Sequence, residues 1–106
     1  MKNKDRVLLA AAELGPKGEP FTVFDLTVRA WIANKLLYGM PGYEMVHPNH
    51  QKVYVATLHL LGRNYRRLTY PGYLKRCGRN LLQLTQAGID RAAKLRKELD
   101  ATSPTA

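Results

Sequence analysis

Three histidines and one cysteine are the side chains in this sequence that could bind a metal ion or attack a substrate. His47-x-x-His50 lacks the paired spacings of a structural zinc site, and His59 and Cys77 come from separate segments. A cysteine–histidine nucleophile would need an orienting carboxylate, and none occurs in that stretch. We therefore expect no metal site, no cofactor and no enzymatic activity.

Basic residues dominate the middle of the chain. The formal net charge is +9, and no acidic residue lies between Glu44 and Asp90. A surface that is merely solvated normally mixes both signs of charge. This one-sided block therefore favours binding to a polyanion over a solvated face. Its basic residues are Lys52, Arg63, Arg66, Arg67, Lys75, Arg76 and Arg79.

The single cysteine and the N-terminal residues bear on the compartment. One cysteine cannot form an intrachain disulfide, which favours a reduced intracellular environment. The N-terminus is charged, and the apolar run over residues 7–12 is too short for a signal-peptide core or a membrane span. We expect a soluble cytoplasmic protein, associated with the nucleoid if the source is bacterial, with no membrane partner and no small-molecule ligand.

The helices that would position these basic residues follow from apolar periodicity and stop signals. The length of 106 residues fits one domain, over residues 1–100, and a disordered tail over residues 101–106. Asn3 or Asp5 is expected to cap a first helix that ends near residue 14. Thr22 is expected to cap a second, largely buried helix that runs to about Leu37, with Asp25 at its third position.

A third helix is expected from Pro48 or Asn49 to residue 61, with an end left open as far as residue 68. At 100° per residue its core face is Tyr54, Thr57, Leu58, Leu61, Tyr65 and Leu68. The opposite, cationic face holds Lys52, His59, Arg63 and Arg66, flanked by Gln51 and Val55.

A β-hairpin and a last helix complete the predicted order of elements. Residues 73–77 and 80–84 are expected to form two strands joined around Gly78-Arg79, with Lys75 and Arg76 close to the turn. Thr85 is expected to cap the last helix. The residues expected to face inward on that helix are Ile89, Ala92, Ala93, Leu95 and Leu99.

This mainly helical pattern with a small β-hairpin resembles the winged helix-turn-helix family of DNA-binding domains, including small bacterial, archaeal and phage transcription regulators. The resemblance covers residues 5–93. Its most specific part is Gly72-Tyr73-Leu74-Lys75-Arg76, followed by Leu84-Thr85-x-x-Gly88-x-x-x-Ala92, which looks like the wing and the start of the final helix in those regulators. Two links, residues 39–47 and 62–70, are longer than is usual in the family.

The resemblance implies a three-helix core, a wing and a C-terminal helix that bind double-stranded DNA sequence-selectively in transcriptional regulation. The third helix would lie in the major groove and the basic wing on the DNA backbone. The expected base-reading residues are Asn49, Gln51, Lys52 and His59. The expected phosphate contacts are Arg63, Arg66, Lys75, Arg76 and Arg79.

Three alternatives remain open. Tyrosines interleave with arginines, as in proteins that stack single-stranded nucleic acid or RNA. A winged helix can also serve as a protein-interaction module of a larger nucleic-acid machine, because fold alone does not fix function. A homodimer is compatible with the apolar stripes on the first and last helices.

Overall fold

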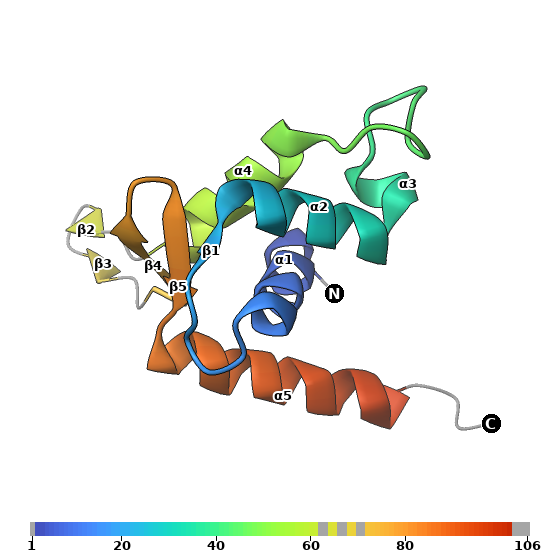
Figure 1. The fold of residues 1–106 in the computed structure, drawn as a ribbon. Coiled ribbons are helices and arrows are strands. Elements are labelled where there is room, and N and C mark those ends of the chain that lie inside the picture. Colours follow the sequence, from blue (N-terminus) through green and yellow to red (C-terminus); the bar gives the residue numbers. More distant parts are fainter. Residues whose placement is uncertain (1, 62–63, 66–67, 70–71, 103–106) are drawn as a thin grey trace.

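The structure is a computed structural model that describes residues 2–61, 64–65, 68–69 and 72–102. These residues form a mainly helical fold with a small antiparallel sheet (Figure 1). No helix in the described part of the chain is long and apolar enough to cross a bilayer. The order of elements is α1 (Asn3–Leu14), β1 (Phe21–Thr22), α2 (Val23–Ala33), α3 (Lys35–Tyr38), α4 (His50–Leu60), β2 (Asn64–Tyr65), β3 (Leu68–Thr69), β4 (Leu74–Gly78), β5 (Leu81–Leu84) and α5 (Gln86–Thr102).

Helix α1 is the centre of the fold. It contacts α2, α4 and α5, which surround it in Figure 1, and its residues Val7, Leu8 and Ala11 are fully buried. The predicted helix is confirmed, but its predicted cap is wrong. The cap position is Lys2, which makes no side-chain cap bond, because Asn3 is already helical and its side chain is bonded to the Tyr38 hydroxyl.

Helix α2 begins as predicted and ends earlier than predicted. Thr22 and Asp25 form a capping box, in which each side chain accepts a hydrogen bond from the other residue's backbone N–H. The expected continuation to Leu37 is wrong, because Asn34 ends α2 and caps α3 by accepting a 3.1 Å hydrogen bond from the Leu37 N–H. An asparagine side chain that bonds its own backbone competes with the helical ladder in this way.

The predicted hairpin is confirmed as β4 and β5, with its turn at Arg79-Asn80, one residue later than expected. Asn80 has a φ of 60°, the left-handed conformation that asparagine tolerates in tight turns. Strand β1 also pairs with β5, through Phe21 opposite Leu82, and gives a sheet in the order β1-β5-β4. From the sequence, only the helix cap at Thr22 is expected in this part of the chain.

Helix α5 is joined firmly to the hairpin. As predicted, Thr85 caps the helix, accepting a 3.0 Å hydrogen bond from the Gly88 N–H, and its hydroxyl donates to the carbonyl oxygen of Gly72 at 2.7 Å. A Cβ on Gly88 would lie 2.0 Å from the Tyr73 carbonyl oxygen, so only glycine allows this close approach. The helix continues through Thr102, two residues into the expected tail.

Helix α4 has Asn49 as its cap, as expected, and ends at Leu60. The open possibility of a longer helix is settled by β2 and β3, which pair as a second small hairpin after it. On α5, Ala92 and Leu95 are buried as predicted. Ala93 and Leu99 are exposed, contrary to the prediction. Ala93 faces away from the side of the helix that holds Ala92 and Leu95, and Leu99 lies in the second half of α5, which extends beyond the body of the fold (Figure 1).

Candidate nucleic-acid interface

Helix α4 exposes a face different from the one that periodicity predicts. Its buried residues are Val53, Ala56, Thr57 and Leu60. At 100° per residue, the side opposite these four is centred on Gln51, Val55 and Leu58. Lys52 and His59 therefore lie at one edge of the exposed face, and His50 and Tyr54 lie at the other. The expectation that Tyr54 is a core residue is wrong, since its side chain is 39% exposed.

Two predicted reading residues have local structural roles. The Asn49 side chain caps α4, and its Oδ1 accepts a hydrogen bond from the Lys52 N–H at 3.3 Å. The Lys52 ammonium lies 5.8 Å from the centre of the Tyr38 ring, within range of a cation–π interaction. Gln51 and His59 are exposed. Of the four, Gln51 is thus the residue at the middle of the exposed face.

The three predicted hairpin cations, Lys75, Arg76 and Arg79, are all exposed. The hairpin is fixed to the end of α4, because the Tyr73 N–H donates to the Leu60 carbonyl at 2.8 Å and Leu61 bridges to Leu74. Arg63 and Arg66, the other two predicted phosphate contacts, lie outside the described residues.

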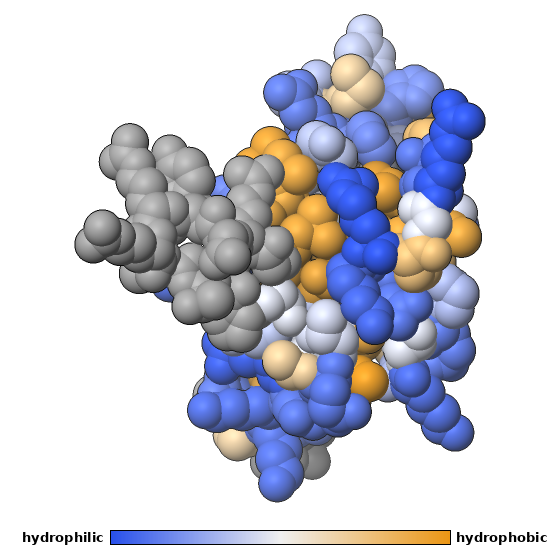
Figure 2. All heavy atoms as spheres, turned by 90° about the vertical axis from the view of Figure 1, so that its left-hand side faces the viewer, coloured by the Kyte–Doolittle hydropathy of each residue, from blue (hydrophilic) through white to orange (hydrophobic). Residues whose placement is uncertain are grey.

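A groove of about 430 Å³ lies between the end of α4 and the first half of β4. Figure 2 shows this side of the molecule, where an apolar area is bordered by long hydrophilic side chains. The groove thus brings two predicted cations of the hairpin beside the C-terminal end of α4. Its lining is Leu58, Leu61, Gly72, Leu74, Lys75, Arg76 and Thr85.

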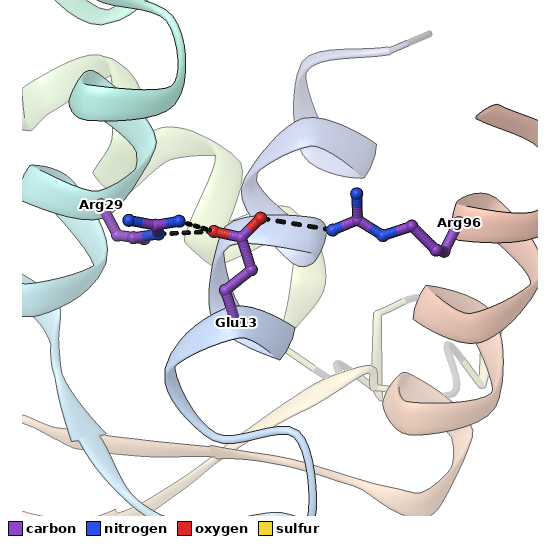
Figure 3. A network of polar contacts seen from close by, with 3 residues as sticks. All are labelled: Glu13, Arg29 and Arg96. Atoms are coloured by element: carbon purple, nitrogen blue, oxygen red, sulfur yellow. Dashed lines mark hydrogen bonds and ion pairs between the residues drawn. The ribbon is translucent and has the colours of Figure 1, made fainter. Parts of the chain in front are cut away.

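Acidic side chains of α1 form ion pairs with α2 and α5, away from this groove. Glu13 bonds Arg29 of α2 and Arg96 of α5, as Figure 3 shows, and Asp5 lies 3.7 Å from Arg91 of α5. In the part of the chain that the structure describes, the hairpin cations make no ion pair. Their charge is therefore available to an anionic partner.

An exposed aromatic stack beside α4 was missed by the sequence analysis. The His50 ring lies 5.6 Å from the Phe24 ring and 6.1 Å from the Tyr54 ring, close to parallel with both. Thr27 Oγ1 donates to the Val23 carbonyl at 2.9 Å and lies within hydrogen-bond distance of His50 Nδ1, at 3.0 Å. The i, i+4 spacing of His50 and Tyr54 was the signal for this contact.

The histidine and cysteine side chains that were considered as metal ligands are not gathered in the described residues. Within residues 2–61 and 72–102, no three histidine, cysteine, aspartate or glutamate side chains lie close enough together to hold an ion. Cys77 is exposed on β4.

Comparison with protein-family models, with curated proteins and with solved structures found no match for this chain.

Proposed function

We propose that this protein binds double-stranded DNA, with α4 in the major groove and the β4–β5 hairpin on the phosphate backbone. The observation that carries the proposal is the shared groove, where Lys75 and Arg76 of the hairpin border the end of α4. The order β1-β5-β4 and the capped start of α5 are in keeping with the winged-helix resemblance of the sequence. Sequence-selective binding of this kind would suit a transcriptional regulator.

The side chains at the middle of the exposed face of α4 suit base edges in the major groove. A glutamine amide can pair with the N6 and N7 atoms of adenine, and an apolar side chain can contact the methyl group of thymine. Gln51 and Val55 offer these two chemistries one helical turn apart. We therefore expect the preferred site to contain A·T pairs opposite the first two turns of α4.

The hairpin cations are assigned to phosphates because they are exposed, form no ion pair with the described residues and lie near a turn. A guanidinium or ammonium group in such a position neutralises backbone charge without reading sequence. Arg79 lies in the turn itself, and Lys75 and Arg76 lie on β4. These three side chains would supply a large part of the affinity and little of the selectivity.

Salt dependence tests the proposal directly. We expect binding to a selected duplex to weaken with added salt with a log–log slope of roughly −4 to −7, because about five to seven phosphates lose their counterions. The measurement is fluorescence anisotropy of a labelled duplex at several salt concentrations. A flat salt response, or no binding to a random duplex pool at low salt, would contradict duplex binding.

Matched charge variants distinguish the hairpin from general cationic attraction. Arg79→Gln should weaken binding to all duplexes alike and make the slope shallower by about one. Lys94→Gln removes one positive charge from an exposed site on α5 and should leave the slope nearly unchanged. Equal effects of the two variants would show that net charge, rather than the hairpin, drives binding.

Single-stranded DNA and RNA are the competing ligands for this surface. The stacked rings of Phe24, His50 and Tyr54 cover the two faces of the central ring, so fewer ring faces remain for bases. Competition with unlabelled single strands of the same sequence decides between the ligands. Duplex should compete at least tenfold better, and a reversed order would favour single-strand binding.

A further inference from the structure

Exposed apolar side chains form a ridge on α2. Phe24, Val28 and Ile32 recur every fourth residue and are 65%, 44% and 53% exposed. Residues four apart lie on the same side of a helix, so the three side chains form one row, which we name the α2 ridge. Leu36 on α3 is also exposed, at 78%. A largely buried α2, as the sequence predicts, would have covered this row.

The first and last helices offer less apolar surface for association. The apolar side chains of α1 are covered by α2, α4 and α5, and Val7 and Leu8 are fully buried. On α5, Ala92 and Leu95 are buried, and Leu99 is 36% exposed. The apolar side chains of these two helices are therefore mostly buried, and the α2 ridge exposes a larger apolar row than either of them.

We propose that the α2 ridge is the interface of a homodimer, in which two copies pair their α2 helices antiparallel about a two-fold axis beside Val28. Val28 is the middle residue of the ridge, so a two-fold axis there sets it against its own copy. Phe24 of each copy then faces Ile32 of the other. Rows of residues four apart pack into one another in this way at the commonest class of helix crossing.

Charge opposes the pairing of two copies less at this surface than at the basic faces. Each copy carries a net charge of +9, so contact between basic faces is repulsive, whereas the three side chains of the ridge are uncharged. Asp25 lies in the first turn of α2, and Lys35 follows its last turn. Antiparallel pairing therefore brings the acidic end of each helix towards the basic end of the other.

The exposed area sets the strength of the proposed dimer. The ridge and Leu36 together offer on the order of 500 Å² per copy, or about 1,000 Å² for a pair, which is the lower limit for a specific interface. The dimer is therefore reversible and forms as the protein concentration is raised. It needs no DNA, so its test is independent of the function proposed above.

Cysteine cross-linking tests the axis. In a Cys77→Ser background, Val28→Cys should give a disulfide-linked dimer under mild oxidation, since a two-fold axis brings the two sulfur atoms within bonding distance. Val55→Cys in the same background is the control, because Val55 is 43% exposed on α4, outside the ridge. No cross-link at residue 28, or equal cross-linking at residue 55, overturns the proposal.

Sedimentation velocity tests the association itself. The parent protein should shift from 12.0 kDa towards about 24 kDa, twice the mass of one chain, as its concentration rises. Val28→Glu should stay monomeric with an unchanged circular dichroism spectrum, and Val55→Glu should dimerise like the parent. A parent that stays monomeric at the highest soluble concentration, or a folded Val28→Glu that still dimerises, overturns the proposal. If Val28→Glu does not fold, the cross-linking result decides.

Discussion

At the scale of single residues, Tyr38 joins the start of α1 to the end of α3. Its ring is almost fully buried, and its hydroxyl donates to the Asn3 carbonyl at 3.2 Å and is bonded to the Asn3 side chain. Burial raises the pKa of Tyr38 from 10.0 to about 12, although the charge of Arg6 lowers it in part. The folded protein therefore keeps this proton at a pH where the unfolded chain has lost it.

The stability of the fold should fall with pH because of Tyr38. A raised pKa contributes stability that is complete below pH 10 and is lost as the pH rises towards 12. Phenylalanine at position 38 cannot titrate. The difference in free energy of unfolding between the parent and Tyr38→Phe should therefore narrow by up to about 2 kcal/mol over this range. Urea unfolding of both proteins at intervals from about pH 9 measures the gap. A deficit that stays constant with pH would contradict the prediction.

Gln51 and Lys52 are neighbours with different expected effects on DNA selectivity. Gln51 lies at the middle of the exposed face of α4, whereas Lys52 is at its edge beside the Tyr38 ring. We predict that Gln51→Ala loses about 1–3 kcal/mol of discrimination between the selected duplex and a scrambled one. Lys52→Ala should lose less discrimination. The reverse order, measured by anisotropy on both duplexes, would place Lys52 at the base edges.

At the scale of elements, the contact between α5 and the segment before β4 requires a residue without a Cβ atom at position 88, which is Gly88. Glycine to alanine in an exposed helix stabilises by about 1 kcal/mol. Gly88→Ala should instead destabilise by about 1–3 kcal/mol, since its methyl group would collide with the Tyr73 carbonyl. Ala87→Gly, at an exposed site in the same turn, should follow the ordinary rule and lose about 1 kcal/mol. Urea unfolding measures both, and a stabilised Gly88→Ala would contradict the close approach.

Local signals predicted the elements better than they predicted the pairing of elements. The caps at Thr22, Asn49 and Thr85 depend on a few neighbouring residues, so they could be read from the sequence. Strand β1 could not, because Phe21 pairs with Leu82, far along the chain. Secondary-structure propensity is a property of neighbouring residues, so it does not identify a pairing partner that is distant in the sequence.

The candidate site was predicted in its residue types and only partly in its geometry. The basic hairpin was identified because Lys75, Arg76 and Arg79 surround turn residues. The predicted exposed face of α4 differs from the observed one by a rotation about the helix axis. The reason is that three successive residues, Val53, Tyr54 and Val55, have largely apolar side chains. The periodicity of apolar residues alone could not show which of the three side chains is buried in the core.

At the scale of the whole molecule, Glu13 connects three helices. Its carboxylate bonds Arg29 and, at 3.2 Å, Arg96 (Figure 3), and all three side chains are partly exposed. Exposed ion pairs contribute up to about 1 kcal/mol each, so Glu13→Gln should lower the free energy of unfolding by about 1 kcal/mol. The loss should shrink in high salt.

A control for Glu13 separates the ion pairs from the change in net charge. Glu19→Gln changes the net charge equally, on the link between α1 and β1. We expect a smaller effect on urea unfolding than that of Glu13→Gln. Equal losses in the two variants, or a loss at Glu13 that does not respond to salt, would show that the three-helix contact adds no stability.

Strand β4 lies at the edge of its sheet, so the hairpin cations also affect how this edge interacts with other molecules. Within the described residues, β4 pairs with β5 on one side, and no strand covers its other side beyond Leu74. Open edges of this kind recruit strands from other molecules and start aggregation, which lysines and arginines prevent by mutual repulsion. We therefore expect Lys75, Arg76 and Arg79 also to limit aggregation of the purified protein. Polyanions that neutralise these charges without covering the edge would make the protein precipitate.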